Sequence, residues 1–325
     1  RVEVLEKNEG GGAEPSFGTL PIAQGGTGRQ TLTSNNILVG NGVDPVKLIP
    51  TKSGAFYATG DNTEPSFNTL PIAQGGTGAT SVNNARINFG FLNNAGAHNS
   101  IYRGISLGTS VTTAQWTAIS NGTFEDMYIG DYWTINDVVW RIAAFDYYLT
   151  TGDTACDTHH VVIVPDSKLY THKMNDTDIT TGGYVGSKMY TQGLADAKTA
   201  INNAFGSAHI LSHRQFLCNA VTNGKPTGAS WYDSKVELMT EQNVYGGKVF
   251  APTSDGSTVP TLNTVDKSQF PLFVHDPHMI SNRQGFWLRD VVSATRFALV
   301  GSYGFAGYYT ASYVYGVRPA FSIIG

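Results

Sequence analysis

The chain has 325 residues, of which 41% are hydrophobic and 14% charged, and its formal net charge is −4. An average globular chain carries about 25% charged residues, so charge is scarce here. With no Lys/Arg cluster to contact phosphates, nucleic-acid binding is excluded. No apolar run approaches the ~18 residues that a membrane helix needs, so we expect no membrane insertion.

The start of the chain and the cysteines add two expectations. The sequence begins RVEVLEKNEGGG, without an initial Met and without signal-peptide features, so we expect a fragment or a processed product. Cys156 and Cys218 are too few for a disulfide framework. We expect two unrelated buried thiols, and a pair between them is the alternative.

A repeated segment distinguishes the N-terminal part. Glu14–Gly28 reads EPSFGTLPIAQGGTG and Glu64–Gly78 reads EPSFNTLPIAQGGTG, so the copies differ only at Gly18 and Asn68. Such a short, glycine-rich unit cannot bury a core of its own. We therefore expect it to gain its order from identical copies in other subunits, as in a structural, oligomeric protein.

Short strands and one helix are predicted around these repeats. The strands are expected at 36–42 and 47–49, around an Asn-Gly turn, and at 53–60. The helix is expected over 80–92, with Thr80 or Ser81 as N-cap and Gly90 as its end. We place the domain boundary near residue 95, so that residues 1–95 form a glycine-rich neck and residues 96–325 a compact, aromatic domain.

The C-terminal part mixes strand and helix patterns. Strands are predicted at Tyr128–Tyr148 (two, joined at Asn136-Asp137), His160–Val164, Gly285–Arg289, Arg296–Val300 and Tyr315–Ile324. Helices are predicted from Thr113 to Ile119, from Gly193 to Phe205 before Gly206, from His213 to about Val221 with Ser212 as cap, and from a Ser234–Glu237 capping box toward Tyr245. Strands at both ends with helices between them predict an α+β domain.

Histidine pairs do not indicate a metal site. The pairs are His159 and His160, His209 and His213, and His275 and His278. The second pair has the i, i+4 spacing of a zinc-binding helix, but HILSH lacks the Glu that would act as general base. The other two pairs have no recognisable third ligand. We expect structural histidines, no metal and no cofactor.

Catalytic motifs are also missing from the sequence. There is no Gly-x-Ser-x-Gly elbow and no phosphate-binding glycine loop followed by Lys. A carboxylate pair for glycoside hydrolysis stays open, because the fold sets its spacing. The available carboxylates include Asp126, Asp131, Asp137, Glu237 and Glu241. We expect a protein that is not an enzyme.

Residues 302–315 (SYGFAGYYTASYVY) carry a dense group of aromatic side chains. They are Tyr303, Phe305, Tyr308, Tyr309, Tyr313 and Tyr315. Gly304 and Gly307 are expected to interrupt any strand, so most of this segment should be a surface loop. Tyrosines diluted by small residues are typical of antibody paratopes, and tyrosine rings also stack on sugars. The alternative is that these rings cover a core or pack against a neighbouring subunit.

The N-terminal repeat resembles a motif of bacteriophage tail fibres. The repeated LPIAQGGTG, followed in the second copy by ATS and ARINFGF, is the part that carries the resemblance. In that family the motif commonly lies near the junction of shaft and tip. The resemblance covers roughly the first 95 residues and implies an extended, β-rich, intertwined trimeric neck.

The C-terminal 225 residues resemble the C-type-lectin-like tip domains of phage receptor-binding proteins. Gly285–Arg289 (GFWLR) and Tyr315–Phe321 (YGVRPAF) carry this resemblance, which extends to the variable proteins of diversity-generating retroelements. It implies a ligand-facing surface over 290–315, with Trp287, Arg318 and Phe321 as scaffold. The ligand-binding residues implied are Asp290, Ser293, Ser302, Tyr303, Phe305, Tyr308, Tyr309 and Tyr313. The sugar-binding motifs of calcium-dependent lectins are absent.

These features together predict a homotrimeric tail fibre tip that binds the host cell surface, through a glycan or a protein receptor. We expect it in the virion, at the distal and extracellular end of the fibre, joined to other tail or baseplate proteins. One alternative is a polysaccharide-degrading tailspike, which new reducing ends in host polysaccharide would reveal. The other is a purely structural fibre or baseplate protein, whose tyrosines would be buried between subunits.

Overall fold

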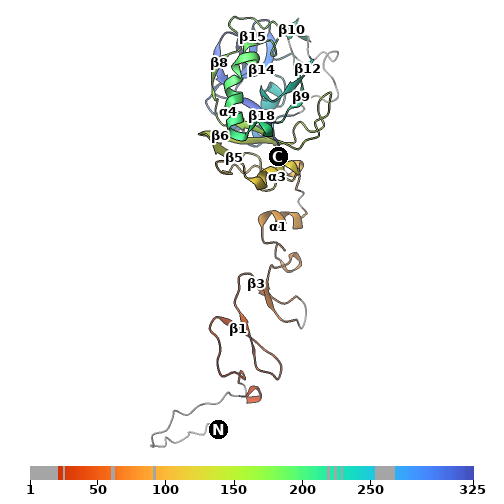
Figure 1. Cartoon of the computed structure of the whole chain (residues 1–325), viewed down its shortest axis with the longest axis vertical. Helices are drawn as coiled ribbons and strands as arrows, with labels where there is room; N and C mark the ends of the chain where they lie inside the picture. Colours follow the sequence, from red (N-terminus) through yellow and green to blue (C-terminus); the bar gives the residue numbers. More distant parts are fainter. Residues whose placement is uncertain are drawn as a thin grey trace, which may run out of the picture. The chain divides into compact units, whose positions relative to one another are not determined.

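The computed structural model describes residues 21–24, 26–59, 63–90, 93–217, 220–222, 225–227, 230–252 and 268–325 (Figure 1). It divides into two compact units, Arg1–Gly90 and Phe91–Gly325. The mixture of helix and sheet agrees with the α+β prediction. The boundary expected near residue 95 falls at α2 (Ala95–Asn99), whose N-cap is Asn94.

The first unit consists of short elements. They are η1 (Ile22–Gln24), β1 (Asn36–Val39), β2 (Lys47–Pro50), β3 (Ala55–Tyr57), β4 (Ser66–Asn68), η2 (Ile72–Gln74) and α1 (Val82–Asn88). β1 pairs with β2 and β3 with β4, both antiparallel. Strands occur at each predicted place, although β1 and β3 are shorter than predicted, and α1 is shorter than the predicted helix and has Ser81 as its N-cap. Residues 60, 91 and 92 of these predictions lie outside the described residues. No described residue of this unit is buried, so these elements enclose no core of their own.

Both copies of the repeat adopt the same turn. In each copy Ile-Ala-Gln forms a 3₁₀ turn, η1 or η2. The matching hydrogen bonds are Gly26 N to Pro21 O (3.0 Å) and Gly76 N to Pro71 O (2.9 Å). The last glycines, Gly28 and Gly78, have φ of 69° and 66°, which is left-handed backbone. Glycine adopts this conformation without steric cost, which explains why GGTG ends both copies.

Two five-stranded sheets form the frame of the second unit (Figure 1). The first has the order β13-β18-β7-β6-β5, with bounds Val236–Leu238, Pro319–Ile323, Val161–Pro165, Val138–Phe145 and Tyr132–Ile135. The second has the order β16-β15-β14-β17-β8, with bounds Ala306–Thr310, Arg296–Val300, Phe286–Ser293, Val314–Val317 and Tyr170–Lys173. The pair β14 and β17 is parallel, and the other neighbours in both sheets are antiparallel.

Helices and two small sheets surround this frame. The helical elements are α2, α3 (Thr113–Ser120), the π-helical η3 (Met189–Gly193), α4 (Ala195–Phe205), η4 (Ser207–His209), α5 (Glu241–Tyr245), α6 (Pro271–His275) and η5 (Pro277–Met279). The small sheets are β9 (His213–Leu217) with β12 (Ser230–Ser234), and β10 (Ala220–Thr222) with β11 (Lys225–Thr227). The predicted helices that become α3 and α4 are confirmed, and Gly206 ends α4. The hairpin at Asn136-Asp137 is confirmed as well, with both residues in left-handed backbone.

One predicted helix is wrong, and another begins later than predicted but ends as expected at Tyr245, before Gly246. His213–Leu217 is the strand β9, in which buried and half-buried residues alternate with the period of two that a strand requires. The Ser234–Glu237 segment does not cap a helix, because Ser234 Oγ donates to the buried Glu237 side chain at 3.0 Å. The capping box is formed instead by Thr240, at the start of α5.

Two hydrophobic clusters make up the core of the second unit. The larger includes Trp133, Trp140 and Phe321 of the first sheet together with inward residues of β14 and β15. The smaller lies on the other face of the second sheet and includes Trp287, Phe297 and Val317. Because the second sheet is packed on both faces, its edge strand β16 has a rigid support.

Candidate functional site

The predicted recognition surface, 290–315, runs from the end of β14 to the start of β17. The prediction that most of 302–315 is a loop is wrong, because Ala306–Thr310 forms β16. Gly307 does not interrupt this strand but pairs with Leu299 of β15. The strand preference of the two tyrosines and the threonine that follow outweighs the cost of one glycine.

A tight hairpin loop joins β15 to β16 and presents Tyr303. Gly301 N donates to Phe305 O and Gly304 N to Gly301 O, each at 2.8 Å. Gly304 has φ of 84°, so this is a three-residue loop that ends in a left-handed residue. Tyr303 lies in the loop and is 77% exposed. Tyr245 Oη donates to Gly304 O at 3.2 Å, which fixes the loop to α5.

Replacing Gly304 with alanine is expected to lower the free energy of unfolding by about 1–2 kcal/mol, the cost of left-handed backbone for an L-residue. The added Cβ would also lie 2.7 Å from Ser281 Cβ. Thermal unfolding followed by circular dichroism measures the loss. Gly247→Ala is the matched control, because nothing lies within 4 Å of its added Cβ. Equal stability of the two variants would contradict the assigned loop geometry.

The aromatic side chains of β16 divide between the two faces of the sheet. Tyr309 stands opposite Phe297 and Tyr308 opposite Ala298, so the neighbouring tyrosines point to opposite sides. The ring centroids of Tyr309 and Tyr313 are 4.2 Å apart, and those of Tyr313 and Tyr315 5.9 Å. We call Tyr309, Tyr313 and Tyr315 the tyrosine row.

The tyrosine row runs from the surface into the core. Tyr309 and Tyr313 are 50% and 43% exposed. Burial raises the pKa of Tyr315, which is half-buried, and Tyr313 adds to the shift. The ring of Tyr315 lies 5.8 Å from that of buried Trp287, whose Nε1 donates to His172 O at 2.9 Å. The outer rings therefore rest on a fixed base.

The turn between β16 and β17 is held on two sides. Ala311 N donates to Thr295 O at 2.9 Å, and Asn175 N donates to Ala311 O at 2.8 Å. Ser312 N donates to Asp178 Oδ1 at 3.0 Å. Hydrogen bonds from Ser312 lower the pKa of Asp178. Tyr313 thus projects from a fixed turn, and sequence analysis missed Asp178 because its role arises only through the fold.

Beside this turn lies a polar groove of about 350 Å³. Its lining includes Asn175, the residue that bonds to the turn, and the side chains of Thr177, Thr181 and Lys188. The Lys188 ammonium pairs with Asp176 at 2.9 Å. Hydroxyl, amide and charged groups therefore lie next to the segment that carries the tyrosine row.

Tyr308 belongs to a separate group on the opposite face. Its ring centroid lies 4.9 Å from that of Phe250, and the Arg296 guanidinium lies 5.2 Å from it, within cation–π range. Glu241 accepts the backbone N–H of Phe250 at 3.0 Å and thereby positions it. Sequence analysis missed Phe250 and Arg296.

The other predicted site residues have varied surroundings. Asp290 Oδ2 accepts the Glu241 N–H at 2.7 Å, so this carboxylate stabilises the start of α5. Ser293 Oγ accepts the Thr295 N–H at 3.3 Å. Ser302 is half-buried in the hairpin loop. The ring of Phe305 is 58% exposed and covers the backbone of Gly301.

The residues expected to be scaffold are buried. Trp287 and Arg318 are 0% and Phe321 is 2% exposed. The Arg318 guanidinium donates to Pro165 O and Met279 O, both at 2.8 Å, and lies 5.0 Å from the ring centroid of Phe286. Burial lowers the pKa of Arg318 to about 10. Two carbonyls and an aromatic face thus accommodate a buried cation beneath the site.

The histidines and the cysteine have contacts within the fold. His209 stacks on Trp116 at 4.0 Å and bonds to Ile324 O, while His213 lies on β9. Among the described residues, no group of three His, Cys, Asp or Glu side chains could hold a metal ion. Cys156 is buried and unpaired in the described part of the chain, and Cys218 lies outside it.

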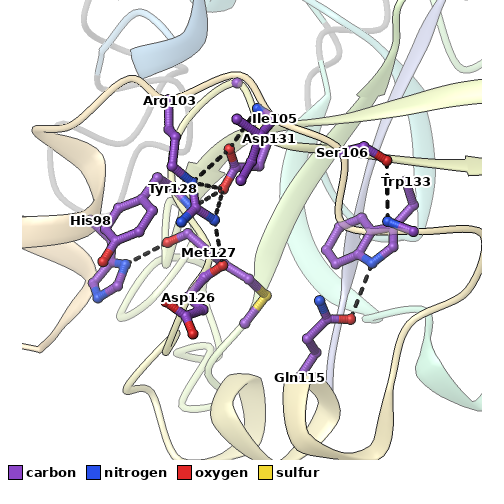
Figure 2. A network of polar contacts seen from close by, with 12 residues as sticks. His98, Arg103, Ile105, Ser106, Gln115, Asp126, Met127, Tyr128, Asp131 and Trp133 are labelled. Carbon is purple, nitrogen blue, oxygen red and sulfur yellow. Dashed lines mark hydrogen bonds and ion pairs between the residues drawn. The ribbon is translucent and has the colours of Figure 1, made fainter. Parts of the chain in front are cut away.

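Three of the carboxylates that sequence analysis left open serve the fold. Figure 2 shows Asp131, which accepts hydrogen bonds from Arg103 and from the backbone N–H groups of Ile105 and Tyr128. Glu241 accepts backbone N–H groups of residues 249–251. Glu237 is buried, which raises its pKa, and accepts the Tyr184 hydroxyl at 2.7 Å. Asp126 and Asp137 lie at turns with left-handed backbone.

No family model, curated protein or solved structure matches this chain. Each described helix is too short or too polar to cross a membrane.

Proposed function

We propose that this chain is the distal part of a bacteriophage tail fibre, which attaches the virion to the host cell surface without catalysis. The tyrosine row carries this proposal. Tyr309 and Tyr313 are exposed, contact each other and stand on a turn held by hydrogen bonds. Rigid tyrosines lose little conformational entropy on binding and offer large contact areas.

The repeats support assembly into a homotrimer. Both copies form the same turn, yet the described part of the first unit has no buried residue. Apolar side chains such as Leu38, Val43 and Val82 are at least 50% exposed, which suits contacts with further copies. In this proposal residues 1–95 form an intertwined neck that also joins other tail or baseplate proteins.

The proposed head, residues 96–325, has a C-type-lectin-like fold in which the tyrosine row faces the receptor. Each head would bind a glycan or a protein weakly. Three heads on one fibre raise the effective concentration of the second and third contacts, which converts weak binding into firm attachment. The polar groove beside the row supplies hydrogen-bonding groups for such a receptor.

Removing the outer rings of the row is expected to weaken attachment by at least about tenfold, since aromatic anchors contribute about 2 kcal/mol or more to interfaces. The double variant Tyr309→Ser/Tyr313→Ser tests this. Fluorescently labelled protein is titrated on bacterial strains with different surface polysaccharides, and bound protein is counted by flow cytometry. Tyr308→Ser is the matched control, because Tyr308 points to the opposite face.

Two outcomes would contradict the proposal. One is a double variant that binds cells as well as the unmodified protein, and the other is an unmodified protein that binds no strain. Light scattering on the same samples measures the oligomeric state, so that a loss of cell binding can be distinguished from a loss of oligomer assembly. If the double variant dissociates the oligomer, the tyrosines are buried between subunits and the protein is a structural fibre component.

A further inference from the structure

A second groove, whose lining includes no residue of the tyrosine row, lies between α4 and the strands β12 and β13. Its volume is about 310 Å³, at the lower end of the range for small-molecule sites. One wall is helical and includes Tyr190, Lys198 and Asn202. Lys198 and Asn202 lie one turn apart on α4 and therefore share a face. The other wall includes Lys235 and Val236.

The two lysines of this groove, Lys198 and Lys235, make no direct ion pair in the described part of the chain. The acidic groups of the groove have partners of their own, although the Lys198 charge also acts on the buried Glu237 carboxylate and Arg214 also pairs with Asp153. Asp233 pairs with Arg214 at 3.2 Å, and Glu237 accepts hydrogen bonds from Tyr184 and Ser234.

The groove also offers an aromatic face and neutral polar groups. The Lys198 ammonium lies 5.7 Å from the ring centroid of Tyr190, so the cation and the ring belong to one surface. Asn202, Ser207 and Ser212 add an amide and two hydroxyls. Val236 adds an apolar contact at the base. A ligand that fits needs an apolar face, several hydroxyls and a negative charge.

From this combination we propose that the groove binds an acidic sugar unit, with a carboxylate or phosphate between Lys198 and Lys235 and the C–H face of the ring on Tyr190. The groove is separate from the tyrosine row, so the head has two sites. The source of the sugar, a bacterial surface polysaccharide, rests on the proposed function. The chemistry by which the groove binds an acidic sugar does not depend on that function.

Saturation-transfer difference NMR with the intact chain tests the proposal, because it detects millimolar binding. The probes are methyl glucuronide, glucose 6-phosphate and neutral methyl glucoside. Both acidic probes are expected to bind at about 1 mM and the glucoside about fivefold more weakly, the ratio that an exposed ion pair of about 1 kcal/mol provides. Binding of the acids should weaken as NaCl rises from about 20 to about 300 mM. A preference for one acid identifies the anionic group.

Lysine variants locate the site. Lys198→Gln and Lys235→Gln are each expected to weaken glucuronide binding by about threefold to fivefold, while Lys168→Gln, an exposed lysine outside the groove, leaves it unchanged. Equal binding of the neutral glucoside, no saturable binding of either acid, or an equal loss in the Lys168 variant would overturn the proposal. The Tyr309→Ser/Tyr313→Ser variant should retain glucuronide binding. If the unmodified protein binds glucuronide but attaches to no cells, the proposed function is contradicted. The sugar site in the groove is still supported in that case.

Discussion

Replacing Asp131 with alanine is expected to lower the free energy of unfolding of the second unit by about 3–5 kcal/mol, as breaking a buried ion pair does. The Asp131 side chain is fully buried, and its Oδ2 lies 2.7 Å from Arg103 Nη2. It also accepts backbone N–H groups of Ile105 and Tyr128 at 3.0 and 2.8 Å. All these donors lose their acceptor in the variant, and the Arg103 charge is left without its partner (Figure 2).

The position of Asp131 explains why so much depends on one side chain. Arg103 lies over the ring of Tyr128 at 4.5 Å and donates to Asp126 O at 2.7 Å. Through these contacts Asp131 connects residues 103–105, near the start of the second unit, to residues 126–131, which directly precede β5. Backbone hydrogen bonds such as Arg103 N to Ile129 O (2.9 Å) and Tyr132 N to Ile105 O (3.0 Å) join the same segments, and Asp131 adds the side-chain contacts between them.

Urea unfolding followed by tryptophan fluorescence measures the effect. Asp157→Ala, which removes an exposed carboxylate, should change the unfolding free energy by less than about 0.5 kcal/mol. Asp131→Asn keeps the shape and part of the hydrogen bonding, so an intermediate loss is expected. An alanine variant as stable as the Asp157 control would show that the Asp131 contacts contribute nothing to stability.

Much of the fold follows from local sequence signals. The β5–β6 hairpin depends on Asn136 and Asp137, residue types that accept left-handed backbone. The helix α4 ends at Gly206, the residue type expected there. In such segments the start and stop signals lie within the segment itself, so no knowledge of tertiary contacts is needed.

Other elements depend on partners distant in sequence. His213–Leu217 has apolar residues that fit a helix, but its pairing with β12 makes it a strand. The site shows the same limit. Reading 302–315 as a loop grouped Tyr308 with Tyr309, whereas a strand puts neighbours on opposite faces. The contact of Phe250 with Tyr308 depends on Glu241, which no local pattern predicts.

Acidification from pH 7 to pH 5 is expected to cost the second unit about 2 kcal/mol through His213 alone. Burial lowers the pKa of His213 to about 3, and His160 and Arg289 add to the shift. Its ordinary value is 6.5. In the unfolded chain His213 therefore binds a proton below about pH 6.5, whereas in the folded chain it stays neutral down to about pH 3. The contribution of neutral His213 to the free energy of unfolding is therefore fully present above pH 6.5, and it is lost as the pH falls from 6.5 toward 3.

The hydrogen bonds around His213 independently indicate that protonation of this residue destabilises the fold. Arg289 Nη1 donates to Gln215 Oε1, which turns the amide nitrogen of Gln215 toward His213. That nitrogen lies 2.9 Å from His213 Nε2, so Nε2 must accept the hydrogen bond and cannot carry a proton. If His213 Nε2 were protonated, its N–H would face the N–H group of Gln215, so two donors would meet without an acceptor. The positive charge of Arg289 would lie beside them. His160 also has a lowered pKa because of burial and acts in the same direction.

Urea unfolding at a series of pH values tests this account. His213→Gln removes one proton-linked site, so the loss of stability between pH 7 and pH 5 should shrink by about 2 kcal/mol. His278→Gln, at an exposed histidine, should keep the slope of the unmodified chain. If the His213 variant keeps the full slope, the acid sensitivity arises elsewhere. Because His160 stays in place, a residual slope of the same sign is expected, and the difference between the two variants isolates the contribution of His213.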